Sequence, residues 1–114
     1  MSDRSVRQFI SEPIRPARGT ADVAAMARGE PGLPARFTWR GRLYTVSAVL
    51  ETWKTSTREG LRPTGDLYLR RHWYRLQTTL GPIMTLYCQR QARPAPSPAA
   101  KNRWFLYTIE EAGK

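Results

Sequence analysis

The chain has 114 residues, with 19 Lys and Arg against 9 Asp and Glu, which gives a formal net charge of +10. Its single Cys and single His exclude a disulfide within the chain and a zinc site built from the usual three or four Cys and His ligands. No apolar run approaches the ~20 residues of a membrane span, and the N-terminus lacks the apolar stretch of a signal peptide. We therefore expect one domain in a cytoplasmic protein, with no membrane segment, no metal and no other cofactor.

Charge and aromatic residues are concentrated in the same part of the chain. Residues 1–35 carry five Arg and four acidic residues, a net charge of +1, whereas residues 36–114 carry 14 basic and five acidic residues, a net charge of +9. The second stretch also contains every Trp and Tyr. We expect an N-terminal edge strand and a flexible Ala-, Gly- and Pro-rich excursion in residues 1–35, a β domain in residues 36–110, and a tail in residues 111–114.

The first 35 residues offer one strand and one short helix. Residues 6–10 (VRQFI) suit a strand, which Pro13 and Pro16 would end or confine to a sheet edge. Residues 22–28 can form two turns of helix with Thr20 as the cap, and the glycines and prolines that follow would stop it. A surface excursion without regular structure is the alternative for this helix.

From Arg36 onward the pattern is typical of β-structure. Residues 36–40 and 43–50 alternate and are rich in aromatic and β-branched side chains, and Gly41-Arg42 between them predicts a two-residue type II′ turn. We expect the second strand to continue through Trp53, with a bulge or bend near 51–53, in preference to a helix.

The remaining strands follow two loops. Residues 54–66 are polar, with two Gly and one Pro, and predict the first loop. Residues 67–78 and 83–89 then predict a second hairpin, and the three prolines within 92–101 predict an extended connection to a closing strand at 104–109.

Five or six short strands joined in this way predict an all-β fold, either with or without one short helix in the 20–28 region. Such a sheet must protect its edges, and a small antiparallel barrel or strongly curved sheet of the SH3-like or OB-like kind achieves this. An open sheet covered by the helix is the alternative.

Period-two alternation assigns the two faces of the second hairpin. Tyr74 and Leu76 should point inward, and Arg71, Trp73 and Arg75 should point outward. In the partner strand Met84, Leu86 and Cys88 should face the core, which leaves Tyr87 on the outer face.

Arginines around flat aromatic rings suit single-stranded nucleic acid, because guanidinium groups contact phosphates and ring faces stack on bases. We predict stacking on Trp73 and Tyr87, with phosphate contacts from the nearby arginines. The predicted binding residues are Arg70, Arg71, Trp73, Arg75, Tyr87, Arg90 and Arg103. Ordinary cross-strand packing with cation–π contacts and a protein-binding face are the two alternatives.

Catalytic chemistry has little support in the sequence. His72 lies between Arg71 and Trp73, and its nearest acidic residues, Glu59 and Asp66, fall in the predicted loop before it, so a partly buried structural histidine is favoured over a general base. No Walker or dinucleotide-binding motif occurs, and the spacing of the acidic residues selects no carboxylate pair. We therefore expect no enzymatic activity, with a His72-dependent hydrolase as the alternative.

Several motifs resemble a family of small uncharacterised bacterial proteins with a W-R-G-R-x-Y-x-V and V-L-E-x-W core. The matching segments are 37–46 (FTWRGRLYTV), 49–53 (VLETW), 73–78 (WYRLQT) and 104–107 (WFLY). Members are encoded beside mutasome genes for inducible translesion DNA synthesis in some genomes, so the resemblance implies a DNA-damage context but no assigned activity. This chain departs from the pattern in its insertion at 17–34 and its Pro-rich loop at 93–98.

Together, these observations predict a non-enzymatic basic binding module associated with nucleic acid, with single strands favoured. The alternative is an accessory subunit that docks an acidic protein partner through a sheet edge or an aromatic patch.

Overall fold

The computed structural model of the chain describes residues 6–58, 68–91 and 103–111. Its elements are β1 (Val6–Pro13), β2 (Arg15–Pro16), α1 (Val23–Ala27), β3 (Arg36–Trp39), β4 (Arg42–Arg58), β5 (Tyr68–Thr78), β6 (Ile83–Gln91) and β7 (Trp104–Glu111). The predicted all-β class is confirmed, with seven strands where five or six were expected. Within the described residues, no helix is long and apolar enough to cross a membrane.

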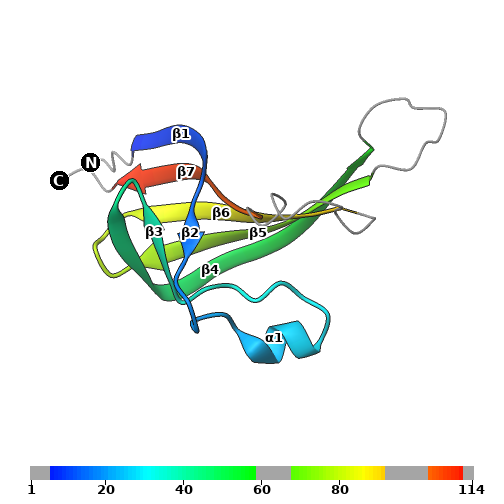
Figure 1. Ribbon diagram of the computed structural model, residues 1–114. Helices are drawn as coiled ribbons and strands as arrows, with labels where there is room; N and C mark the ends of the chain where they lie inside the picture. Colours follow the sequence, from blue (N-terminus) through cyan, green and yellow to red (C-terminus); the bar gives the residue numbers. More distant parts are fainter. Residues whose placement is uncertain (1–5, 59–67, 92–102, 112–114) are drawn as a thin grey trace.

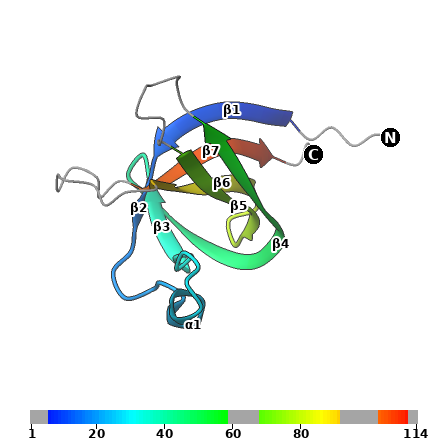
Figure 2. The same ribbon diagram turned by 90° about the vertical axis from the view of Figure 1, so that its right-hand side faces the viewer.

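The strands form one strongly curved antiparallel sheet, a half-barrel, in the order β1-β7-β6-β5-β4-β3-β2 (Figures 1 and 2). Each strand from β2 to β6 pairs with the next one along the chain, and β1 pairs with β7. Only Ile14 separates β1 from β2, and its N–H donates to the carbonyl of Trp104 at 3.0 Å. One continuous N-terminal segment therefore spans from one edge of the sheet to the other.

Strand β4 bends as it passes from one partner strand to the next. Its first residues, 42–45, pair with β3, and its residues from Val46 to Arg58 pair with β5. The β4–β5 register shifts once just after Val46 and again just after Val49. Each shift adds a residue to β4 and bends it, so the bends lie slightly earlier than the predicted position near 51–53.

The prediction of a loop from residue 54 is wrong for residues 54–58, which continue β4. Thr55 pairs with Arg71 and Ser56 with Arg70, so backbone pairing with β5 outweighs the polar character of this segment. Threonine also favours strands because its branched side chain suits a pleated surface. The rest of that predicted loop lies outside the described residues, as does the loop at 92–101.

The β3–β4 turn is one residue earlier than predicted. Trp39 pairs with Arg42, so Arg40 and Gly41 are the two central residues. Their φ angles are 51° and 77°, and two positive values define a type I′ turn in place of the predicted type II′ turn. Arg42 is therefore not a turn residue but the first residue of β4.

Helix α1 confirms the short helix of the 20–28 region, but its cap is Asp22. The N–H of Ala25 donates to Oδ1 of Asp22 at 3.1 Å. Thr20, the predicted cap, instead donates its hydroxyl to the carbonyl of Ala17 at 2.9 Å. A carboxylate at the N-cap accepts the first unpaired N–H groups of the helix.

The core fills the concave side of the half-barrel. Strands β3 to β7 and Ile14 supply its buried members, and Ile10 of β1 packs against them at the margin. The buried members are Ile14, Phe37, Trp39, Tyr44, Tyr74, Leu76, Met84, Leu86, Cys88, Trp104, Leu106 and Ile109. The inward orientation predicted for Tyr74, Leu76 and Cys88 is confirmed. Burial also raises the pKa of Tyr74 to about 12.

Candidate functional site

Aromatic side chains cross the convex side of the sheet, which we call the outer face. Alternation along β5 places Arg71, Trp73 and Arg75 there, as predicted. The outer face carries six rings in mutual contact, defined here as the aromatic row: Phe9, Trp53, Trp73, Tyr87, Phe105 and Tyr107. These rings come from β1, β4, β5, β6 and β7.

Trp73 is the centre of the aromatic row. Its ring stacks on Trp53 at a centroid distance of 5.7 Å and an interplanar angle of 2°, and it meets the rings of Tyr87 and Tyr107, each at 4.9 Å. Its Nε1–H donates to Oγ1 of Thr55 at 2.8 Å. Such contacts fix the plane of the ring.

The burial of the rings changes which of them can receive a base. Trp73 and Tyr87, the two predicted stacking residues, are only 8% and 6% exposed. Trp53 covers Trp73, and the Arg71 guanidinium lies 4.6 Å from the Tyr87 centroid. The exposed rings are instead Phe9 at 64%, Trp53 at 38% and Tyr107 at 36%.

Arg75 belongs to an ion-pair cluster at one side of the aromatic row. Its guanidinium donates to both Glu110 oxygens, at 2.9 and 3.2 Å, and lies 3.9 Å from Glu51. Arg7 lies 3.6 Å from Glu110. Arg75 was predicted to contact a phosphate. In the structure its guanidinium instead pairs with the carboxylates of Glu110 and Glu51.

Glu110 is the buried member of this cluster, with a side chain 7% exposed. The hydrogen bonds from Arg75 hold the pKa of Glu110 below its ordinary value, and the charges of Arg75 and Arg7 act in the same direction against the desolvation of the carboxylate. The same hydrogen bonds raise the pKa of Arg75.

The lowered pKa of Glu110 predicts a loss of stability in acid. A carboxylate with a lower pKa in the folded state stabilises the fold above its unfolded pKa of about 4.3, and this contribution disappears as the pH falls through the folded pKa. Glu110→Gln should therefore show a flatter fall of melting temperature below about pH 4 than the wild type. Thermal unfolding followed by circular dichroism from pH 2.5 to 7 measures this, and parallel profiles would contradict it.

The other predicted arginines do not all share the outer face. Arg71 lies there, and its Nε is buried without a hydrogen-bond partner among the described residues. Arg103 is exposed, and its carbonyl accepts from the N–H of Gln89 in β6 at 2.9 Å. Arg70 is exposed on the opposite face of β5 from Arg71, because neighbouring residues of a strand alternate. Arg90 pairs with Arg70 in the β5–β6 register, and its side chain lies outside the described part of the structure.

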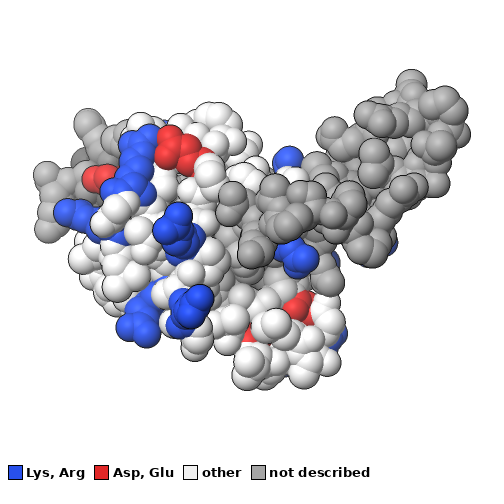
Figure 3. All heavy atoms as spheres, viewed as in Figure 1, with Lys and Arg blue, Asp and Glu red and all other residues white. Residues whose placement is uncertain are grey.

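Basic groups outnumber acidic ones on the visible surface. In Figure 3, blue side chains are spread over the region of β1, β3 and the end of β7, with few red ones between them. Most described acids already have a basic partner, since Glu12, Glu30, Glu51 and Glu110 all form ion pairs. The excess positive charge is therefore left available to an external anion.

Sequence reasoning missed four members of the aromatic row: Phe9, Trp53, Phe105 and Tyr107. The spacing of Phe105 and Tyr107 was a usable signal, because two residues apart means the same face of a regular strand. Phe9 was harder to find, because the register of β1 shifts between Phe9 and Glu12.

His72 lies on the side of β5 opposite to the aromatic row. It is half-buried, and its ring lies 5.8 Å from that of Tyr74. Among the described residues, no three His, Cys, Asp or Glu side chains are grouped in a way that could hold a metal ion.

A family model places the chain among proteins of shared descent. The model described as "Domain of unknown function (DUF6504)" matches residues 1–111, so the chain belongs to this family. Searches of curated proteins and of solved structures gave no match. An uncharacterised family thus covers nearly the whole chain, in agreement with the kind of resemblance that the sequence indicated.

Proposed function

We propose that this protein is a non-enzymatic module that binds single-stranded nucleic acid across the outer face of its sheet. The observation that carries the proposal is the aromatic row, which has exposed rings at both ends and lies on the same face as two arginines, Arg71 over the Tyr87 ring and Arg103 two residues before Phe105. Neither arginine has a carboxylate partner among the described residues.

The buried and exposed rings have different roles in this proposal. Trp73 and Tyr87 are buried and support the row. Trp53 and Tyr107, which contact them, are exposed and offer ring surface to nucleobases. Stacking of a base on an aromatic ring is worth about 1–3 kcal/mol and tolerates any sequence. Small curved sheets of the OB-like kind bind oligonucleotides with a similar combination of rings and positive charge.

The resemblance described above supplies the cellular setting of the proposal. Because that resemblance is to a family encoded beside mutasome genes in some genomes, we propose a DNA-damage context in a bacterial cytoplasm. A module that holds single strands fits this setting, since damaged templates expose them.

Fluorescence anisotropy with a labelled single-stranded oligonucleotide tests the proposal. Binding should be detectable at 50 mM salt and should weaken about 50-fold by 200 mM if four phosphates are neutralised, since each contributes a slope of about −0.7. Trp53→Ala should weaken single-strand binding by about 5- to 150-fold, the equivalent of one lost stack. Duplex binding should change less.

Two matched variants control for general effects. Leu43→Ala removes an apolar side chain that is 51% exposed but outside the aromatic row, and Arg18→Gln removes an exposed charge from the segment between β2 and α1. Arg71→Gln should weaken binding more than Arg18→Gln. Absence of oligonucleotide binding at 50 mM salt, or equal losses in Trp53→Ala and Leu43→Ala, would refute the proposal.

A second function, docking of a protein partner, is favoured by the edge of β4. From Ser47 onward β4 pairs only with β5 among the described residues, and every described side chain from Ser47 to Ser56 is exposed. An unpaired edge that shows Val49 and Leu50 can accept an extended strand. A complex with an acidic protein that survives high salt and is lost in Val49→Pro would support this function over the first.

A further inference from the structure

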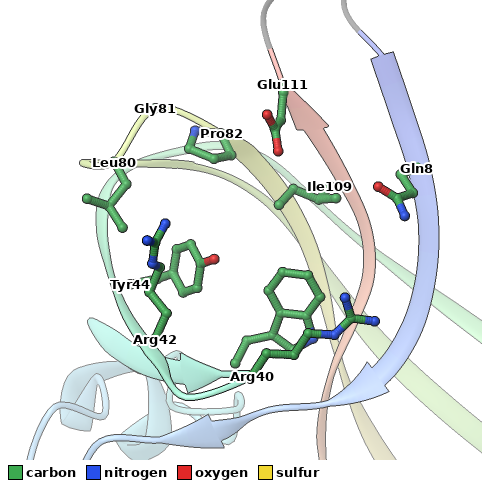
Figure 4. A pocket seen from close by; sticks show the side chains of 10 residues that line it. Gln8, Arg40, Arg42, Tyr44, Leu80, Gly81, Pro82, Ile109 and Glu111 are labelled. Atoms are coloured by element: carbon green, nitrogen blue, oxygen red, sulfur yellow. The ribbon is translucent and has the colours of Figure 1, made fainter.

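A pocket opens at one end of the half-barrel, away from the aromatic row (Figure 4). It lies between the β3–β4 turn, the β5–β6 turn and the ends of β1 and β7, and its volume is about 650 Å³. Cavities of about 300–1,000 Å³ at barrel mouths are common sites for small ligands. We call it the barrel-mouth pocket.

The walls of the pocket are rigid and partly aromatic. Trp39 and Tyr44 lie in the wall with ring centroids 6.2 Å apart, and Phe37 stacks behind Tyr44 at 5.7 Å. Glu12 holds Trp39 by accepting its Nε1–H at 2.9 Å, and it also pairs with Arg40. These contacts fix the aromatic wall before any ligand arrives.

Two oppositely charged side chains face the pocket. Arg42 extends toward the opening from the start of β4, and Glu111 extends toward it from the end of β7 (Figure 4). Neither forms an ion pair with a described residue, although Arg40 beside them is held by Glu12. The Tyr44 hydroxyl, also in the wall, has no hydrogen bond to a described residue.

The chemistry of these groups defines the ligand. A guanidinium can donate two parallel hydrogen bonds and a carboxylate can accept two, so Arg42 and Glu111 together favour a ligand with acceptors on one edge and donors on another. Trp39, Tyr44 and Ile109 are only 9%, 6% and 6% exposed, so they close the floor of the pocket and are not free stacking surfaces. Guanine presents two acceptors, O6 and N7, to an arginine and has donors at N1 and N2 for a carboxylate. Adenine offers one acceptor and one donor on the corresponding edge, so it matches less well.

We propose that the barrel-mouth pocket binds a guanine base, held by hydrogen bonds with Arg42 and Glu111 over the floor that Trp39 and Tyr44 close. The base can come from a free nucleotide or from an unstacked position in a single strand, because both present the same edge. The pocket is separate from the aromatic row, so this site does not depend on the function proposed above.

Titration of the ¹⁵N-labelled full chain with guanosine tests the site, because the uncharged nucleoside avoids general attraction to a basic protein. Guanosine should shift the amide signals of Arg42, Gly81 and Ile109 with saturation, and adenosine should bind at least tenfold more weakly. Arg42→Gln and Glu111→Gln should each reduce guanosine affinity by about 5- to 150-fold, as expected for one bidentate pair.

The controls separate this site from the outer face. Arg36→Gln, an exposed arginine outside the pocket, and Trp53→Ala, in the aromatic row, should leave guanosine affinity unchanged. A thymidine oligonucleotide with one guanine that binds more tightly than one without identifies a strand as the source, and equal binding identifies a free nucleotide. No saturable guanosine shift, equal affinity for adenosine, or full affinity in Glu111→Gln overturns the proposal.

Discussion

Replacing Trp73 by alanine is expected to lower the free energy of unfolding by about 3–5 kcal/mol, the range found for buried aromatic residues. Trp73 is 8% exposed and contacts three other rings, and its Nε1–H bond to Thr55 is also lost. The collapse of the aromatic row would then be a consequence of lost packing. A loss of nucleic-acid binding in this variant would therefore not identify Trp73 as a ligand contact.

Chemical denaturation of three variants checks this prediction. Trp73→Phe keeps a ring and should lose less stability than Trp73→Ala. Trp53→Ala removes the more exposed ring of the stacked pair and should lose less as well. A loss below about 1 kcal/mol in Trp73→Ala would mean that the aromatic row contributes little to the fold.

Replacing Arg75 by glutamine is expected to destabilise the fold by about 2–3 kcal/mol at neutral pH. The Glu110 carboxylate, 7% exposed, would lose two charged hydrogen bonds and keep only the longer approach of Arg7 at 3.6 Å. A buried charge without its partner retains its desolvation penalty, which explains the size of the effect.

The double variant Arg75→Gln, Glu110→Gln distinguishes the loss of the Arg75–Glu110 hydrogen bonds from the desolvation penalty of an unpaired Glu110 carboxylate. It should be more stable than Arg75→Gln alone, because no buried charge is left. The penalty in Arg75→Gln should also shrink in acid, where Glu110 becomes protonated. Urea denaturation at pH 7 and pH 4 measures both effects, and simple additivity of the two single changes would contradict the pairing.

The parts of the fold that depend on local pattern were predictable. Alternation in β5 and β6 was enough to place Leu76 and Met84 in the core and Trp73 and Tyr87 outside it, because side chains in a regular strand change face at every residue. The two hairpins and the short helix were also visible as alternation bounded by glycine and proline.

Local pattern was insufficient where distant segments meet. Tyr87 faces outward, as alternation requires, yet it is buried because Phe105 from β7 and Arg71 from β5 cover it. The ion pair of Arg75 with Glu110 could not be predicted from local spacing, because the two residues lie 35 positions apart. The barrel-mouth pocket needs four separate turns and strand ends to converge, which no local spacing reveals.

The pairing of β1 with β7 also determines the order in which the chain can fold. Val6 lies opposite Glu111, so this ladder closes a loop of almost the entire chain, whereas β3 to β7 can pair as successive hairpins. Closing the longer loop carries the larger entropy loss and favours late formation. During synthesis, β1 must therefore remain without its ladder partner until β7 has left the ribosome.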